Sequence, residues 1–393
     1  MSRPRFGDQP EVGRDVLDAQ IGVAELRPLG LGDVLGRSRA ALGLRPLTAP
    51  ALVFVPLGVA LGPAGLGWIS IEVLGYLYPV AAVALAILGL FVGLGFDPSD
   101  ADERRLLGVA STEALISIVV VGGAFAALLW QWNLPLDVAI APLALVFGVC
   151  AAATSSGIVR PDDPEPYRRA SRIAELDDVL PIVLGGLVLA MYTGTTTLGV
   201  LYVAALNIGA AVAVALAGGM LFERAKDPAE RAVFVLGVIT LLGGGAQYLG
   251  VSPLLAGMVA GLVWRFMPGD ADAVVRADLL RLQHPLVLLL LIFAGASAQF
   301  GTLALWLAGP YVLMRLCGKL LGGWVLNRLT PSVSPADLGS YLLPPGVIGL
   351  SFALSFHLVA LSSGSAAALT AVAAGTLASE VLAALALLGP RKA

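Results

Sequence analysis

Long apolar stretches recur along the whole chain and restrict it to a membrane-spanning, all-helical fold. Hydrophobic residues make up 58% of the 393 residues and charged residues 13%, more apolar surface than a water-soluble core can bury. About twelve of the stretches are long enough to cross about 30 Å of hydrocarbon at about 1.5 Å of rise per residue. The predicted spans are 47–68, 71–95, 106–130, 135–158, 173–192, 195–222, 232–250, 252–267, 283–300, 302–326, 337–361 and 365–389.

The placement of Lys and Arg gives an independent check on the number of spans. All but two of the 24 basic residues fall in terminal or connecting segments on one predicted side of the membrane. The positive-inside rule assigns that side to the cytoplasm. We therefore expect a multi-pass protein of the cell inner (plasma) membrane with both termini in the cytoplasm. Its predicted parts are an N-terminal tail (1–46), a transmembrane domain (47–389) and a short C-terminal tail (390–393).

Two adjacent carboxylates, Asp177 and Asp178, lie inside the predicted span 173–192. An ionised carboxylate at membrane depth costs on the order of 3 kcal/mol on insertion scales, so residues of this kind usually have a function. Successive helix residues project about 100° apart, so the two side chains cannot face one cavity equally. We expect one to face an ion path and the other a cationic partner, which together predict an ion or proton site.

The two basic residues that lie within a span are Arg315 and Lys319. They are four residues apart, so they share one helix face and either can reach the aspartates from an opposing helix. A desolvated Lys can release its proton, whereas Arg in practice cannot. A further acidic residue, Glu113, either lines the same path or pairs with Arg104 and Arg105 nearer the cytoplasm.

Two spans contain residues that interrupt a helix at membrane depth. Thr154 and Ser155, near the end of 135–158, carry hydroxyls that can bond the backbone or ligate a desolvated ion. In span 337–361, two consecutive prolines remove two backbone donors and precede a glycine. Corresponding interruptions in two halves predict an inverted-repeat transporter with two broken helices that cross near the midplane. The predicted breaks are Ser156, Gly157, Pro344, Pro345 and Gly346.

Six motifs occur in an order that resembles a known family. They are PLGVALGPAGLG, LGLFVGLGFD, ATSSGIV, LDDVLPIVLGGLVLA, GVSPLLAGMVAGLVW and RLCGKLLGG. Over residues 50–388 the chain resembles the monovalent cation/proton antiporter superfamily, most closely its bacterial sodium/proton and potassium/proton exchangers. The resemblance implies that Asp178 chiefly binds the cation and that Asp177 forms a salt bridge. It favours Lys319 as the salt-bridge partner and proton carrier, with Arg315 as runner-up.

The resemblance also implies a homodimer and a core bundle made of spans three to five and ten to twelve. The expected function is antiport of a monovalent cation, Na⁺ or K⁺, against protons by alternating access. The alternatives are a sodium-coupled organic-anion symporter on a related fold and a non-transporting membrane sensor or scaffold. We expect no enzyme activity, no cofactor and no nucleic-acid partner, since no nucleophile–base pair or metal-ligand cluster is visible. The expected partners are the cation, protons, the lipid bilayer and a second copy of the chain.

Overall fold

The computed structural model describes residues 50–97, 99–132, 139–155, 165–194, 196–225, 227–267, 271–330 and 338–388. Every regular element within these ranges is an α-helix, which confirms the predicted all-α class. The two predicted tails, 1–46 and 390–393, and the predicted break residues Ser156 and Gly157 lie outside the described residues.

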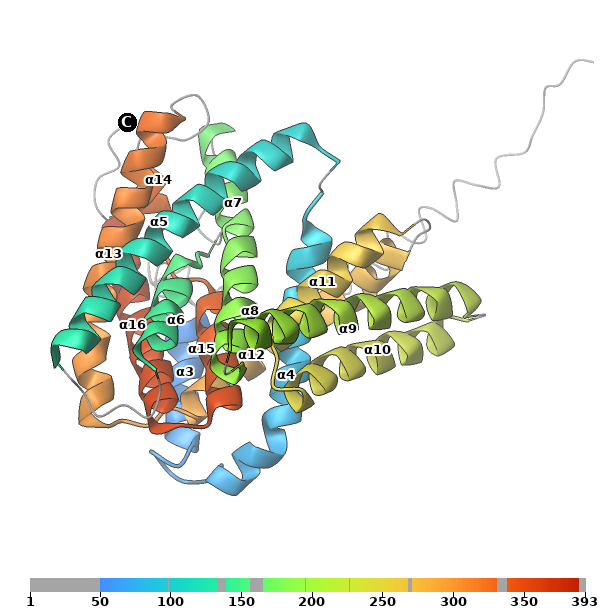
Figure 1. Ribbon diagram of the computed structural model, residues 1–393, viewed down its shortest axis with the longest axis horizontal. Coiled ribbons are helices and arrows are strands. Elements are labelled where there is room, and N and C mark those ends of the chain that lie inside the picture. Colours follow the sequence, from blue (N-terminus) through green and yellow to red (C-terminus); the bar gives the residue numbers. More distant parts are fainter. Residues whose placement is uncertain are drawn as a thin grey trace, which may run out of the picture. The chain divides into compact units, whose positions relative to one another are not determined.

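The helices coincide with the predicted spans, although 173–192 and 337–361 are each divided into two helices. Among the described residues, six helices are long and apolar enough to cross a membrane, and shorter apolar helices accompany them. The helices are α3 (Pro50–Leu61), α4 (Ile71–Gly95), α5 (Ala101–Trp132), α6 (Ile140–Ala152), α7 (Glu165–Leu176), α8 (Val179–Thr193), α9 (Thr197–Arg224), α10 (Pro228–Tyr248), α11 (Pro253–Phe266), α12 (Ala271–Ala296), α13 (Thr302–Leu329), α14 (Leu338–Tyr341), α15 (Val347–Ala360) and α16 (Ser363–Leu388) (Figure 1).

Local signals fix where several of these helices begin. Ser252 caps α11 by accepting a hydrogen bond from the backbone N–H of Leu255 at 3.2 Å, and Pro253 occupies the first helical position. Asp227 and Pro228 start α10 in the same way. A side-chain cap satisfies an orphan N–H, and proline there has no N–H to leave unpaired. Short polar turns therefore suffice to separate consecutive apolar helices.

The helices pack into two bundles. In the first, which we call the core bundle, α5 packs on α6 and α13, α13 packs on α16, and α15 packs on α6 and α16. In the second, the scaffold bundle, α4 packs on α10, α11 and α12, α3 packs on α12, and α9 packs on α10 and α11. Figure 1 shows α9 and α10 side by side. In addition, α7 packs on α5 and α8 packs on α6, so the core bundle consists of spans three to five and ten to twelve, as the resemblance implied.

Close backbone contact between α4 and α11 holds the scaffold bundle together. A Cβ atom added to Gly257 of α11 would lie 1.9 Å from the carbonyl oxygen of Ala86. A Cβ added to Gly89 of α4 would lie 1.9 Å from the carbonyl oxygen of Leu254. Small residues at a helix interface in a membrane allow backbones to approach and gain dispersion contacts. Only glycine fits at these two positions without moving the two backbones apart.

We expect Gly257→Ala to destabilise the protein, because the added methyl group meets a carbonyl oxygen of the α4 backbone. Overpacking of this kind costs about 1–3 kcal/mol and should lower the melting temperature in detergent by several degrees. The matched control is Gly237→Ala on α10, where an added Cβ meets nothing within 4 Å. Equal melting temperatures for the two variants would contradict the proposed close packing.

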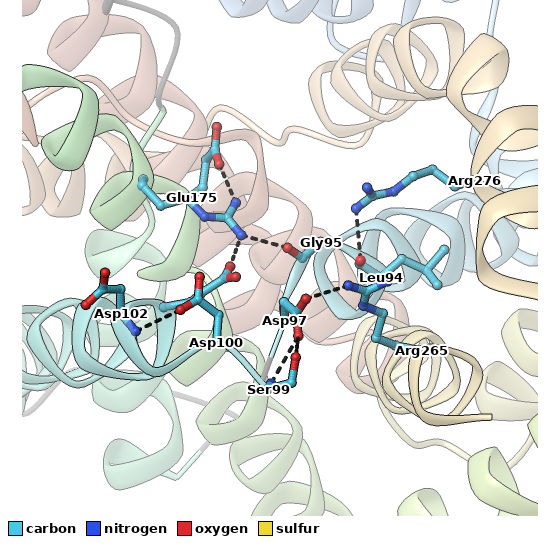
Figure 2. A network of polar contacts seen from close by, with 11 residues as sticks. Leu94, Gly95, Asp97, Ser99, Asp100, Asp102, Glu175, Arg265 and Arg276 are labelled. Atoms are coloured by element: carbon cyan, nitrogen blue, oxygen red, sulfur yellow. Dashed lines mark hydrogen bonds and ion pairs between the residues drawn. The ribbon is translucent and has the colours of Figure 1, made fainter. Parts of the chain in front are cut away.

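A polar network surrounds the linker between α4 of the scaffold bundle and α5 of the core bundle (Figure 2). Arg276 Nη2 donates a hydrogen bond to the carbonyl oxygen of Leu94 at 2.9 Å. Arg172 Nη2 donates to the carbonyl oxygen of Gly95 at 2.8 Å and also pairs with Glu103. The last carbonyls of a helix have no intrahelical partner, and here the two arginines satisfy two of them.

Asp97 fixes the middle of this linker. Its carboxylate accepts hydrogen bonds from the hydroxyl and the backbone N–H of Ser99, at 2.5 and 3.0 Å, and from Arg265 Nη2 at 2.6 Å. Figure 2 shows Asp97 between these two partners. The bonds from Ser99, followed by that from Arg265, lower the pKa of Asp97 to about 2. The carboxylate is therefore ionised at neutral pH and anchors the linker to α11.

Candidate functional site

The span that carries the paired aspartates is interrupted at the aspartates themselves. α7 ends at Leu176 and α8 begins at Val179, so Asp177 and Asp178 form the turn between two helices. The expectation of one continuous span over 173–192 was wrong. Pro181 gives the physical reason, because it has no N–H to donate to the carbonyl oxygen of Asp177 four residues earlier.

The two segments in which breaks were predicted meet each other. Thr154, just after the end of α6, forms an isolated antiparallel bridge with Pro345, just before α15. The backbone N–H of Ser155 donates to the carbonyl oxygen of Pro344 at 3.1 Å. Two unwound segments from distant parts of the sequence therefore cross and pair, as the predicted broken helices required.

Gly346 allows the two segments to approach so closely. Its backbone N–H donates to the carbonyl oxygen of Ala153 at 3.3 Å. A Cβ atom at this position would lie 2.7 Å from the carbonyl oxygen of Thr154. Glycine is needed here because of this contact and not because of an unusual φ, since its φ is −80°.

Lys319 of α13 lies at the same place and is completely buried. Its Nζ atom is 2.9 Å from Oε2 of Glu113 and 3.2 Å from Oδ2 of Asp177. It also donates to the carbonyl oxygen of Ala152, the last residue of α6. One ammonium group thus contacts two buried carboxylates and the carbonyl end of a broken helix.

Glu113 of α5 belongs to this group, for which the sequence had left two roles open. It is completely buried, and its Oε1 atom accepts a hydrogen bond from the hydroxyl of Ser117 at 2.9 Å. Of the two roles considered for it, the structure favours the one at the path, because its carboxylate points to Lys319. The sequence signal for this placement is Ser117, which lies four residues after Glu113 on the same face of α5 and can therefore bond the Glu113 carboxylate within the bundle.

Arg315 lies one turn before Lys319 and is also buried. Its guanidinium donates to the carbonyl oxygen of Leu343 through Nη1 and to that of Ala153 through Nη2, the latter at 3.2 Å. Each of these carbonyls belongs to one of the two unwound segments. The C-terminal end of α6 carries partial negative charge, so two cations beside it are favourable. Arg315 therefore ties the crossing together, while Lys319 contacts Asp177.

The aspartates retain oxygen atoms for a ligand. Oδ1 of Asp177 and Oδ1 of Asp178 are buried, and neither has a hydrogen-bond partner among the described residues. The side chain of Thr154 lies next to the carboxylate of Asp177. A buried acceptor without a partner is costly, and such oxygens commonly bind a proton or a hard cation. The arrangement can hold one small positive ion between the α7–α8 turn and the helix crossing.

No family model matches the sequence, and no curated protein matches it. A solved structure does match the fold, that of the sodium proton antiporter MjNhaP1 from Methanocaldococcus jannaschii. The two structures superpose with a TM-score of 0.61 at 20% sequence identity, over 95% of this chain and 100% of the other. The chain has the fold of a sodium/proton antiporter. This is the fold that the resemblance noted in the sequence implied.

We expect Lys319→Gln to destabilise the protein strongly, because it leaves Glu113 and Asp177 buried without their counter-ion. Breaking a buried ion pair from one side typically costs about 3–5 kcal/mol, which should appear as a lower melting temperature. The control is Arg105→Gln, an exposed change near the start of α5, which should change stability by less than about 0.5 kcal/mol. If Lys319→Gln melted like the wild type, the buried network would not hold the bundle together.

Proposed function

We propose that this protein is a secondary active antiporter that exchanges a monovalent cation, Na⁺ or K⁺, for protons by alternating access. The observation that carries the proposal is the pair Asp177 and Asp178, placed at the crossing of two broken helices and beside a buried ammonium. Charge at this depth is expensive and is retained where it serves transport. The antiporter fold of the matched structure supports the same function.

Exchange follows from competition at the aspartates. A cation would take oxygen ligands from Asp177 and Asp178 and from the hydroxyls of Thr154 and Ser155. A proton on Asp178 removes the charge that the cation needs, so the two cannot be bound together. Lys319 holds Asp177 while no cation is present. Movement of the core bundle against the scaffold bundle then exposes the loaded site to either side in turn.

In the proposed orientation the protein spans the inner membrane of the cell. Both termini and the linker network of Figure 2 lie in the cytoplasm. The support is the distribution of basic residues, which almost all lie on that side.

We further propose a homodimer formed through the scaffold bundle. Within the described chain, α9 is the least buried of the six long apolar helices, and it lies beside α10 at the edge of that bundle.

We expect Asp178→Asn to abolish exchange while the protein still folds. An amide keeps the shape of the side chain but neither titrates nor supplies a full negative charge to a desolvated cation. In proteoliposomes with a preformed proton gradient, Na⁺, K⁺ and Li⁺ are added in turn and collapse of the gradient is recorded. Asp102→Asn, an exposed change at the start of α5, is the control and should keep wild-type flux. Wild-type flux in Asp178→Asn would remove this residue from the site.

The orientation predicts that residue 169 is cytoplasmic and that residue 363 is external. In a variant that lacks Cys150 and Cys317, a membrane-impermeant maleimide added to intact cells should label Ser363→Cys and leave Arg169→Cys unlabelled. Permeabilised cells, in which both positions should react, are the control for expression and accessibility. The opposite pattern in intact cells would reverse the topology.

A further inference from the structure

Two serines of α15 are buried without a hydrogen-bond partner. Ser351 and Ser355 have 2% and 1% of their surface exposed, and neither hydroxyl has a partner among the described residues. A buried hydroxyl in a helix usually bonds the carbonyl of the preceding turn, as Thr370 does with Ala366 at 2.9 Å. These two serines therefore need an explanation that ordinary helix packing does not give.

The contacts of other α15 residues show which sides of this helix face the core bundle. Gly349 faces α6, since a Cβ atom on it would lie 2.4 Å from the carbonyl oxygen of Cys150. Phe352 faces α8, because its ring lies 2.5 Å from the position of a Cβ on Gly185. His357 faces α16, with its Nδ1 atom 3.1 Å from the hydroxyl oxygen of Ser365.

The two serines point to the remaining side, toward the scaffold bundle. At about 100° per residue, Ser351 lies about 200° and Ser355 about 240° around the helix from Gly349. Leu358 lies in the same direction, and its carbonyl oxygen accepts a hydrogen bond from Nε2 of Gln247 on α10 of the scaffold at 3.3 Å. α15 also packs on α4, α11 and α12 of the scaffold bundle.

The surface that covers this side of α15 is apolar. One continuous hydrophobic cluster contains α15 residues together with Leu85, Leu254, Leu290 and Phe293 of the scaffold bundle. The two hydroxyls are therefore desolvated at a boundary between bundles, and neither bonds a polar group of the described residues in this arrangement. An arrangement of the two bundles that brings water or an ion to these hydroxyls would regain the free energy lost in this way.

We propose that Ser351 and Ser355 line the external half of the cation path, which the scaffold bundle closes in this structure. The inference rests on the proposed antiport and orientation. α15 runs from the break at Gly346 toward the external side, so Ser351 lies about 7 Å and Ser355 about 13 Å along the helix from the crossing. When the bundles separate on that side, the hydroxyl oxygens replace part of the hydration shell of a monovalent cation on its way to or from the aspartates.

Thiol accessibility tests the path directly. In the variant lacking Cys150 and Cys317, Ser351→Cys and Ser355→Cys are treated, during exchange, with a positively charged, membrane-impermeant methanethiosulfonate added from outside. Both should react, and exchange should fall at least tenfold. Ala353→Cys is the matched control: it lies on the same helix, is equally buried and faces α6, and it should not react. Absence of reaction at both serine positions in variants that still exchange would overturn the proposal.

Alanine variants give a second test that does not depend on labelling. Ser355→Ala removes a hydroxyl without a partner, so it should raise the melting temperature by a few degrees and slow maximal exchange severalfold. Ser365→Ala, in the first turn of α16, removes a hydroxyl bonded to His357 and Ser362 and should lower the melting temperature. A lower melting temperature with unchanged exchange in Ser355→Ala would overturn the path. Failure of the wild type to exchange any cation would instead overturn the proposed antiport itself. The same vesicle assay measures exchange by the wild type and by the variants, so the two failures can be distinguished.

Discussion

The structure depends on how backbone groups are satisfied where helices break inside a membrane. Without water, each unpaired carbonyl or N–H at this depth costs several kcal/mol. The unwound segments around Thr154 and Pro345 meet part of this requirement by pairing with each other. The rest comes from α13, because Lys319 and Arg315 donate to carbonyls of both segments. The same two cations thus make the crossing possible and place positive charge beside the aspartates.

The closest contacts within the scaffold bundle differ in kind from those between the two bundles. Within the scaffold bundle, Gly89 and Gly257 bring the backbones of α4 and α11 into direct contact. Between the bundles, the close approach at Gly186 of α8 meets the side chain of Leu255 on α11, not its backbone. Packed cores and interfaces tend to have discrete alternative arrangements, and side chains that slide past each other permit shear motion. The packing between the bundles is therefore compatible with the relative movement that the proposed alternating access requires.

Sequence reasoning succeeded where one residue type has one strong physical consequence. Apolar length located the spans, and Pro344, Pro345 and Gly346 located a break that the structure contains. It missed the break at Asp177 because apolar length predicts one span over 173–192 and does not show where a proline such as Pro181 divides it. The contact of Glu113 with Lys319 and the role of Arg315 at the crossing depend on how distant helices pack, which no local pattern encodes.

Pro181 has a consequence for how an ion would be coordinated. Since it provides no N–H four residues after Asp177, the carbonyl oxygen of Asp177 lacks the donor that a regular helix would supply, and it could serve as a backbone ligand in the proposed cation site. A backbone oxygen held by two helix ends cannot shift with the radius of the ion as readily as a flexible side chain can. Discrimination between a smaller and a larger alkali cation would then be set by the geometry of the helix break as well as by the number of charges around it.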